Sequence, residues 1–401
     1  MFPQKSDNDA VIVAACRTPI GKVARDGGAL SGVRPEGLGA AVVKEVLRRT
    51  PQLRAQHVND VIFGCAIPEK EQGGNIARNI SLLAGLPVNV PGMTVSRFCA
   101  SGLEAIADAA FRIRDGRADV IIAGGVESMS TMMPVLLPML LPTQSSPEHA
   151  RRFHPKLLRD TQLYITTVGG AEVLRKAYGI SRQEQDAFAL ESHRRAVQAQ
   201  DLVKFSEELI PLQTPNGFVN TDEGPRRDTS PEKLSKLEPI MKSLDPCATV
   251  TAGNASQASD GAAAMLLMSR KQAVELGAKP LARFVDYAVT GCAPEYFGIG
   301  PFDAINAVLR RTSRVMRDIG LVELNEAFAV QALAVLRCIY IDRNILNVNG
   351  GAIALGHPLG CTGARIATSL IYEMQRRGAE FGLETMCIGG GMGAAGIFQL
   401  E

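Results

Sequence analysis

The sequence contains residues of the types that carry nucleophilic and acid–base catalysis, each beside a turn rich in small residues. Cys99 lies in the run Ser-Arg-Phe-Cys-Ala-Ser-Gly, directly before a segment with helical periodicity, Leu103–Arg114. A thiol at the N-terminal end of a helix is close to the positive end of the helix dipole and to free backbone N–H groups, which favour the thiolate. We therefore expect a lowered pKa and a nucleophilic role for Cys99. The alternative is a small buried hydrophobic residue, which is what most cysteines are.

A histidine and a second cysteine occupy the glycine-rich last third. His357, one of five histidines, stands in Gly-Gly-Ala-Ile-Ala-Leu-Gly-His-Pro-Leu-Gly. An imidazole within hydrogen-bond reach of a cysteine acts as its base, whereas the alternative for His357 is to cap a turn. Cys387 begins Cys-Ile-Gly-Gly-Gly-Met-Gly, whose glycines, Gly389 among them, let a substrate approach the backbone closely. A second thiol there could transfer a proton; the alternative is a buried strand cysteine beside a structural turn.

An asparagine and a glutamate follow a predicted apolar strand. Asn325 and Glu326 come directly after Gly320–Leu324. A polar pair after such a strand points into a cleft, where an asparagine could orient a water molecule or donate to an oxyanion. The alternative is that Asn325 is a helix N-cap.

Composition excludes several classes of protein. The 401 residues are 46% hydrophobic and 21% charged, which excludes a disordered chain or a coiled coil. The 43 basic and 41 acidic residues give a net charge of +2 and form no basic block, so we expect no nucleic-acid partner. The eight cysteines show neither a Cys-x-x-Cys pair nor zinc spacing, so we expect no metal site and a reducing compartment.

Targeting and membrane signals are absent from the sequence. The N-terminal run has neither an apolar core nor an Arg-rich amphipathic pattern. The most apolar run, Met132–Leu141, contains Pro134 and Pro138 and is too short to span a bilayer. We expect a cytoplasmic protein without membrane contact, or one in an organelle matrix if a presequence has been lost.

Short apolar runs alternate with helical periodicity at both ends of the chain. The runs are apolar throughout, which is typical of strands in a parallel or mixed sheet covered on both faces. The predicted strands are 11–15, 58–66, 120–123, 320–324 and 386–388, and the predicted helices are 37–49, 103–114, 170–178, 182–200, 304–311 and 363–376.

The last third repeats the first in register. Val-Leu-Arg-Arg-Thr occurs at Val46–Thr50 and again at Val308–Thr312, an offset of 308 − 46 = 262, and the same offset relates Cys99 to Cys361 and Gly116 to Gly378. Three matches in one register predict a duplication. The stretch between the copies is richer in proline and charge. We therefore predict an N-terminal half (1–126 with 247–278), an inserted loop domain (127–246) and a C-terminal half (279–401), with one cleft where the two glycine-containing loops face each other.

Taken together, the motifs resemble the thiolase family. Arg-Phe-Cys-Ala-Ser-Gly, Asn-Glu-Ala-Phe, the glycine-rich histidine run and Cys-Ile-Gly-Gly-Gly-Met-Gly occur in the family's order and spacing, and the likeness covers nearly the whole chain. The resemblance implies an α/β fold of two similar βαβαβαββ halves stacked in five layers, plus a loop domain.

By the same resemblance, the chain is an acyltransferase that acts on 3-ketoacyl-CoA. Cys99 would be the nucleophile, His357 its activating base, and Cys387 the group that protonates the acetyl-CoA enolate and later deprotonates the incoming CoA. One oxyanion hole would use His357 Nε2 and a water held by Asn325, and the other the backbone N–H groups of Cys99 and Gly389. Coenzyme A would be a substrate, with no permanently bound cofactor.

The resemblance also implies where coenzyme A binds, over the loop domain. The expected contacts are Ala252, Ser256, Arg226 (or its neighbour Arg227) and Phe328. Three stretches differ from the family pattern near this site, and they put the preferred acyl chain length in question: Ser96 in place of Asn, Gln257 in place of Gly, and 167–172 in place of Met-Gly-x-Thr-Ala-Glu. The Met- and Leu-rich run 129–141 is either buried, within the loop domain or at a subunit contact, or it forms an adaptable wall for a long or bulky acyl chain or a weak contact with a membrane surface.

We expect a degradative 3-ketoacyl-CoA thiolase of fatty acid β-oxidation. The loop before Gly169 lacks the longer polar stretch that we associate with acetoacetyl-specific members. The alternatives are a biosynthetic acetoacetyl-CoA thiolase and a non-catalytic thiolase-like subunit. The implied assembly is a homodimer or homotetramer, with room for a β-oxidation multienzyme partner.

Overall fold

The computed structural model describes residues 5–24, 26–133, 154–215 and 217–401. One continuous sheet runs in the order β10-β11-β12-β9-β1-β8-β5-β3-β4, with the short β2 paired to β8, and a small hairpin forms from β6 and β7. The strand bounds are β1 Ala10–Arg17, β2 Gly21–Lys22, β3 Asp60–Gly64, β4 Gly92–Val95, β5 Val120–Ser128, β6 Leu212–Thr214, β7 Gly217–Val219, β8 Ser259–Ser269, β9 Ala282–Gly291, β10 Leu321–Leu324, β11 Phe381–Ile388 and β12 Met392–Leu400.

The sheet consists of two parts with a similar strand arrangement, except that the second has no counterpart of β4 in the described chain. In the first, β4, β3 and β5 are parallel and continue into antiparallel β8 and β1. In the second, β10 and β11 are parallel and continue into antiparallel β12 and β9. Among the described strands, the two parts pair through the first residues of β1 and β9, where Val11 and Ile12 pair with Arg283 and Ala282. The predicted duplication is thereby present in three dimensions.

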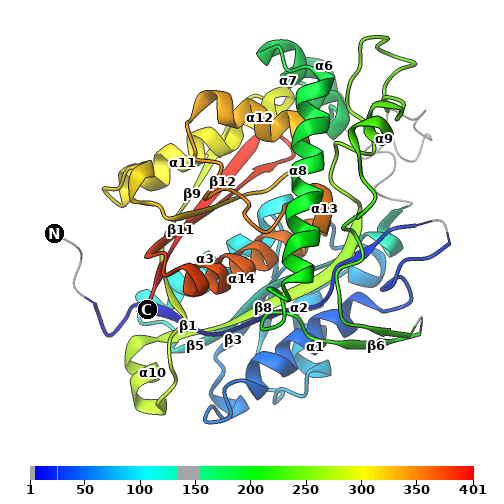
Figure 1. The fold of residues 1–401 in the computed structure, drawn as a ribbon. Coiled ribbons are helices and arrows are strands. Elements are labelled where there is room, and N and C mark those ends of the chain that lie inside the picture. Colours follow the sequence, from blue (N-terminus) through cyan, green and yellow to red (C-terminus); the bar gives the residue numbers. More distant parts are fainter. Residues whose placement is uncertain (1–4, 25, 134–153, 216) are drawn as a thin grey trace.

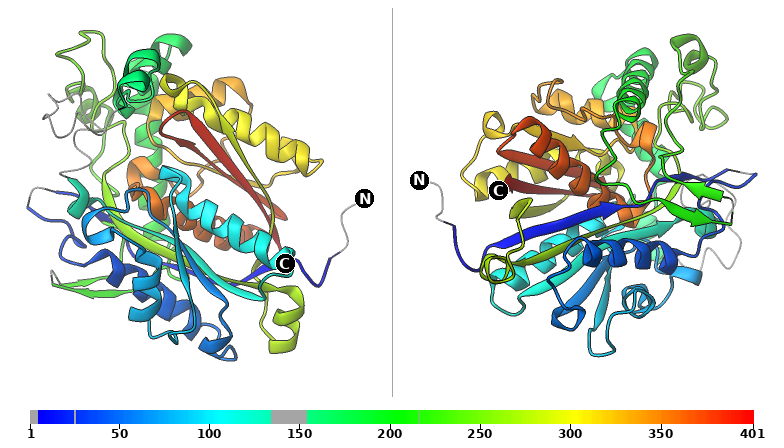
Figure 2. Two further views of the ribbon diagram at one scale, coloured as in Figure 1. Left: turned by 180° about the vertical axis from the view of Figure 1, so that it is seen from behind. Right: turned by 60° about the horizontal axis from the view of Figure 1, so that its bottom comes forward.

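Helices form three layers around the two sheet parts (Figure 1). Helices α1 and α2 cover the outer face of the first part, and α11 and α12 cover the outer face of the second. Helices α3 and α14 lie between the two parts and share one apolar core with both, as the views from behind and below also show (Figure 2). The predicted five layers are therefore confirmed. The helix bounds are α1 Pro35–Arg48, α2 Ile76–Leu83, α3 Ser101–Arg114, α11 Gly300–Arg311, α12 Ala329–Cys338 and α14 Leu359–Arg377.

The segment between β5 and β8 adds helices at one end of the layers. Its longest helix, α8, runs beside the short α13, which precedes α14 (Figure 1). The helices of this segment are α6 Pro155–Asp160, α7 Thr167–Tyr178, α8 Arg182–Asp201 and α9 Pro231–Ser235. Helix α10, Arg270–Leu276, follows β8, and α13, Ala352–Leu355, lies between α12 and α14. Within the described residues, no helix is long and apolar enough to cross a membrane.

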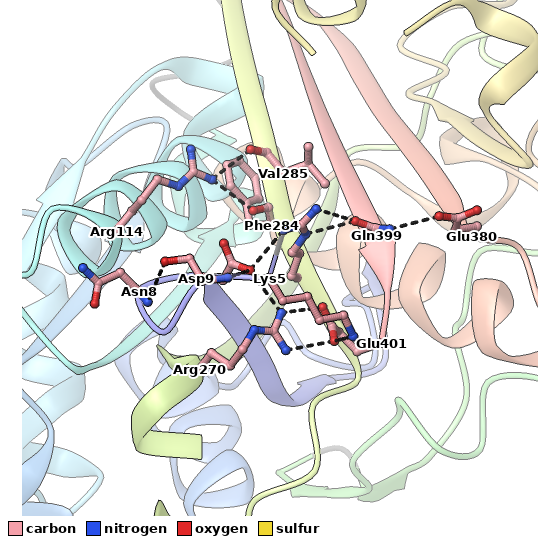
Figure 3. A network of polar contacts seen from close by, with 12 residues as sticks. Lys5, Asn8, Asp9, Arg114, Arg270, Phe284, Val285, Glu380, Gln399 and Glu401 are labelled. Atoms are coloured by element: carbon pink, nitrogen blue, oxygen red, sulfur yellow. Dashed lines mark hydrogen bonds and ion pairs between the residues drawn. The ribbon is translucent and has the colours of Figure 1, made fainter. Parts of the chain in front are cut away.

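A polar network ties the two chain ends together where β1 meets β9 (Figure 3). Asp9 Oδ2 accepts hydrogen bonds from Arg270 (3.2 Å) and Arg283 (3.0 Å). Arg270 also donates to Glu401 at 2.6 Å, and Lys5 donates to the same carboxylate at 2.7 Å. The network therefore links the first part of the sheet to the last residue of the chain.

Candidate active site

The N-terminal ends of α3 and α14 are in backbone contact, which brings the segments before them together. A methyl group on Gly102 of α3 would lie 2.6 Å from the nitrogen of Ala364, and one on Gly363 of α14 would overlap the backbone nitrogen of Leu103. Only glycine permits such an approach. The turn that carries Cys99 and the loop that carries His357 precede these two helices, so the glycines set the two loops side by side.

Cys99 lies in a single 3-10 turn, Phe98–Ala100, immediately before α3. Phe98 has a φ of 45°, a left-handed conformation that costs a non-glycine residue energy and is typical of functional turns. Ser101 stabilises the turn, because its hydroxyl donates to the carbonyl of Phe98 (2.6 Å) and accepts from the N–H of Arg97 (2.9 Å). The N–H of Gly389 lies near the sulfur of Cys99 and favours its thiolate form.

The expected low pKa of Cys99 is wrong for the free protein. Burial raises the pKa of the thiol to about 11, and the N–H groups of Gly389 and of Cys99 itself oppose the rise without cancelling it. The N–H donors at the helix end stabilise the thiolate by less than burial of its charge costs. Cys99 is therefore a thiol at neutral pH until a base takes its proton.

The second thiol is close to the first. Cys387 is fully buried near the end of β11, two residues before Gly389. Burial raises its pKa well above the usual range, and a negative charge on Cys99 raises it further. Because each thiolate disfavours the other, only one of the two sulfurs ionises at a time. This arrangement suits a site in which Cys99 and Cys387 are deprotonated alternately, at different steps of a reaction.

His357 is a buried, neutral imidazole. Burial lowers its pKa to about 3, and the guanidinium of Arg365 lowers it further. Its Nδ1 lies 2.6 Å from the hydroxyl of Thr362, and that hydroxyl donates its only proton to the carbonyl of Pro358 (3.0 Å). The Thr362 oxygen must therefore accept the proton of Nδ1. This tautomer places a lone pair on Nε2, where it can accept a proton.

Asn325 faces the same imidazole from the end of β10. Its Nδ2 lies 3.4 Å from His357 Nε2, and its buried Oδ1 has no hydrogen-bond partner among the described residues. The N-cap alternative is wrong, because Phe328 occupies that position of α12. Asn325 thus keeps an unused acceptor beside the imidazole, as expected of a residue that orients a water molecule.

Comparison with known proteins identifies the family. The model of the thiolase N-terminal domain matches residues 10–271, and that of the thiolase C-terminal domain matches residues 278–400. The chain belongs to the thiolase family. It is 48% identical to a 3-ketoacyl-CoA thiolase of Bacillus subtilis, over 98% of this chain and 99% of that protein. It is 45% identical to a 3-ketoacyl-CoA thiolase of Cronobacter sakazakii, over 97% and 98%.

A solved structure agrees with this placement. The crystal structure of the Bacillus anthracis acetyl-CoA acetyltransferase is similar with a TM-score of 0.86 and 40% identity, covering 98% of this chain and 99% of that one. The predicted family, its fold and the assignment of the chain as an acyltransferase are confirmed. In the part of the chain that the structure describes, no group of three His, Cys, Asp or Glu residues is placed to hold a metal ion.

Three of the four residues expected to contact coenzyme A, namely Ala252, Ser256 and Phe328, lie on segments that are in contact with each other. Ser256 donates its N–H to the carbonyl of Ala327 (2.9 Å), and the adjacent Ala255 forms a bridge with Phe328. Ala252 is exposed in the turn before them. These three residues therefore occur together.

The fourth expected contact, the cationic Arg226, lies in a different part of the chain, between β7 and α9. Its N–H donates to His193 (3.1 Å), while its own side chain is exposed. Its neighbour Arg227 forms an ion pair with Asp201 instead. Arg226 is therefore the better candidate of the two for an anionic group.

The positions that differ from the thiolase pattern have structural partners. Gln257 donates to three carbonyls, those of Gly224 (3.1 Å), Ile353 (3.0 Å) and Ala354 (3.1 Å), so it joins the loop domain to α13. Gly170 leaves room for the ring of Phe297, because a methyl group on Gly170 would lie only 2.6 Å from that ring. Ser96 donates to the carbonyl of Ala66 (3.0 Å).

The Met-rich run 129–141 is only partly described. Residues 134–141 lie outside the described residues. Met129 and Met132 are buried in a small cluster with Ala66 and Ile67. For these two methionines the buried interpretation holds, and a role of the run in binding an acyl chain stays a prediction.

Proposed function

We propose that the chain is a 3-ketoacyl-CoA thiolase that cleaves its substrate through an acyl-enzyme on Cys99. The observation that carries the proposal is the pairing of two thiols: the N–H of Gly389 favours the thiolate form of Cys99, and Cys387 is buried close enough for a charge on Cys99 to raise its pKa. Cleavage needs one sulfur to hold the acyl group and a second group to protonate the leaving enolate. The names of the relatives from Bacillus subtilis and Cronobacter sakazakii support the same activity.

The first half of the reaction uses His357 as base. His357 Nε2 takes the proton of Cys99, and the thiolate attacks the 3-keto carbon. The oxyanion on that carbon accepts from the N–H groups of Cys99 and Gly389, both of which favour a negative charge on the Cys99 sulfur. The C2–C3 bond then breaks, and the electron pair moves onto the acetyl-CoA enolate. His357, now protonated, and a water held by Asn325 stabilise the enolate oxygen, while Cys387 donates its proton to C2.

The second half transfers the acyl group. Cys387, now a thiolate, takes the proton of the incoming CoA thiol, and the CoA sulfur attacks the thioester on Cys99. Collapse of the tetrahedral intermediate releases the shortened acyl-CoA, and Cys99 regains its proton from His357. No resident cofactor takes part in the proposed sequence, because coenzyme A enters as a substrate.

Coenzyme A binds over the loop domain in this proposal. Its pantetheine lies along Ala252, Ser256 and Phe328, and Arg226 meets a phosphate at the nucleotide end. The side chain of Arg226 is exposed and forms no ion pair within the described residues, which supports this assignment. We propose domain boundaries at 1–126 with 247–278, 127–246 and 279–401. Arg226 then belongs to the loop domain, Ala252 and Ser256 to the N-terminal half, and Phe328 to the C-terminal half.

Chain-length preference separates the two active branches. The similar structure from Bacillus anthracis is called an acetyl-CoA acetyltransferase, which favours a biosynthetic acetoacetyl-CoA thiolase as the second candidate. We place the chain in the degradative branch, where it serves fatty acid β-oxidation. A non-catalytic subunit is the weakest candidate, because Cys99, His357, Cys387 and Asn325 are all present.

The experiment follows CoA-dependent cleavage of acetoacetyl-CoA and of a ladder of longer 3-ketoacyl-CoAs, with Cys99→Ala as control. Cleavage that rises with chain length and is lost in the variant supports the degradative thiolase. Activity confined to acetoacetyl-CoA moves the assignment to the biosynthetic branch. Absence of cleavage across the ladder, by protein that still binds CoA, contradicts both.

The proposed assembly is a homodimer, or a homotetramer built from it. Strand β4 ends the sheet in the described chain, and the apolar side chains of Leu82, Leu83 and Val88 near it are exposed. A second copy or a β-oxidation partner subunit could cover this edge. Light scattering of wild type and Val88→Asp tests the dimer, which should weaken in the variant. All eight cysteines are free thiols, which supports a reducing compartment, and we propose the cytoplasm.

A further inference from the structure

His357 has no secondary structure of its own. It lies in the link between α13 and α14, directly after Gly356, whose φ is 98°. Its place relative to Cys99 therefore depends on how the two flanking helices are held. Two buried glutamates hold them, and neither has a part in the proposed reaction.

Glu326 holds the helix before His357. It is the second residue of the Asn-Glu-Ala-Phe motif, and its side chain is 2% exposed. Its carboxylate accepts from the N–H of Ile353 in α13 (3.3 Å), from the Asn347 amide (2.8 Å) and from the Ser192 hydroxyl (2.6 Å). Gly351 is packed so closely against this carboxylate that a methyl group there would overlap it. Glu326 thus joins the end of β10, where Asn325 lies, to α13.

Glu127 holds the helix after His357, and it does so from the other half of the molecule. It lies near the end of β5 and is fully buried. Its Oε2 accepts from the N–H of Gly360 in α14 (2.8 Å) and from the N–H of Ala66 (2.8 Å). Gln72 donates to its other oxygen. Glu127 therefore ties α14 to the sheet part that leads into the Cys99 turn.

We propose that Glu127 and Glu326 are positioning residues that hold His357 against Cys99, each by binding a backbone N–H of one flanking helix. The proposal rests on the proposed function, in which His357 is the base. Buried carboxylates that accept several hydrogen bonds fix their donors firmly, and a displacement of a base by about 1 Å can cost on the order of 100-fold in rate. The two halves of the duplicated fold each supply one of the two contacts.

The test compares Glu127→Gln and Glu326→Gln with Glu208→Gln. A glutamine fills the same space but turns an NH2 group toward one of the donors. Glu208 is an equally buried carboxyl whose side-chain hydrogen bonds in the described chain go to Arg17 and to Ser369. Ser369 lies in α14, nine residues beyond Gly360, so Glu208 binds this helix away from the end that carries His357. We expect kcat to fall at least about tenfold in the first two variants with KM for CoA little changed, and kcat to stay unchanged in Glu208→Gln.

Hydrogen exchange of the backbone provides a readout that does not depend on turnover. Peptides that cover 351–362 should exchange faster in Glu127→Gln and Glu326→Gln than in wild type, and at the wild-type rate in Glu208→Gln. If Glu127→Gln fails to fold, Gln72→Ala replaces it, because Gln72 donates to Glu127. If Glu326→Gln fails to fold, Ser192→Ala replaces it. Ser192→Ala removes one donor to Glu326 and the acceptor of the Gly351 N–H (3.1 Å), and it should lower kcat in the same direction by a smaller factor.

The outcomes separate this proposal from the proposed function. Wild-type cleavage with unchanged kcat and unchanged exchange in both glutamine variants overturns the positioning role and leaves the function intact. If wild type cleaves no substrate, alkylation of Cys99 replaces turnover. Faster exchange with altered alkylation of Cys99 then supports the positioning role, and wild-type behaviour in both measurements overturns it.

Discussion

The two central residues of the site have pKa values that are shifted apart. Burial raises that of Cys99 to about 11 and lowers that of His357 to about 3, so in the free protein the proton stays on sulfur. A resting thiolate–imidazolium pair is therefore not the state of this site. Proton transfer must accompany substrate binding, when the oxyanion donors gain a charge to stabilise.

Alkylation of Cys99 by iodoacetamide tests this state. Because only the thiolate reacts, the rate at Cys99 should rise by about tenfold per pH unit from about pH 7 to about pH 9, without a plateau. In the unfolded protein the rate should level off near the ordinary cysteine pKa of about 8.5. The rate is measured by mass spectrometry on the Cys99 peptide, since the exposed Cys247 and Cys338 react as well. A plateau near neutral pH in the folded protein would contradict the raised pKa.

The tautomer of His357 depends on one hydroxyl. Thr362→Val removes the acceptor of the Nδ1 proton and leaves the imidazole free to turn or to protonate at Nε2. We expect kcat to fall by about 10- to 100-fold with KM for CoA little changed. Thr368→Val is the matched control, because Thr368 is also buried in α14 and its hydroxyl only donates to the carbonyl of Ala364 (2.8 Å). Equal activity of the two variants would contradict a role of the Thr362 hydroxyl in fixing the tautomer of His357.

At the scale of elements, the contact between α3 and α14 depends on glycine. A methyl group on Gly363 would overlap the backbone of Leu103, and backbone cannot move aside as a side chain can. Gly363→Ala should therefore separate the helices, lower the free energy of unfolding by about 1–3 kcal/mol and reduce kcat. In Gly37→Ala of α1 the new methyl lies 3.8 Å from Val33, so stability should rise by up to about 1 kcal/mol. Chemical denaturation of both variants measures the difference.

The sequence predicts the elements whose pattern is strong and misses those whose pattern is weak. The runs 11–15 and 58–66 correspond to β1 and β3, and the helical stretches 103–114 and 363–376 to α3 and α14. Strand β5 runs on to Ser128 through two glycines that ended the predicted strand at 123. Strand β12, Met392–Leu400, was missed because its glycines and alanines have low β propensity, and pairing with β9 and β11 on both sides overrides that propensity.

The site shows the same division between local pattern and long-range contact. Cys99, His357, Cys387 and Asn325 stand in motifs that local chemistry distinguishes, and the duplication predicts that their loops meet. The partners Thr362, Glu127 and Gln72 lie far apart in sequence or in ordinary helical positions, and only the fold assigns their hydrogen bonds. The pKa of Cys99 could not be predicted either, because it depends on burial by segments distant in sequence.

At the scale of the whole molecule, two similar halves must stay in one relative orientation for the site between them to exist. They are joined by the contact of α3 with α14 at one end of these helices, and by the pairing of β1 with β9 and the network of Asp9 at the other (Figure 3). These two connections differ in kind. The first sets the distance between catalytic loops, whereas the second holds the halves together at a distance from the chemistry.

Removing the centre of that network should therefore affect stability and spare catalysis. Asp9→Ala leaves Arg283, which is 7% exposed, with only Gln399 as a side-chain partner in the described chain. An uncompensated buried cation should lower the free energy of unfolding by about 1–3 kcal/mol. Lys5→Ala breaks an ion pair whose lysine side chain is 64% exposed, so it should cost at most about 1 kcal/mol. Urea unfolding and turnover are measured on both variants at a temperature where both stay folded. A fall in kcat in Asp9→Ala under those conditions would mean that the far connection also sets the distance between Cys99 and His357, and the division of labour between the two connections would be wrong.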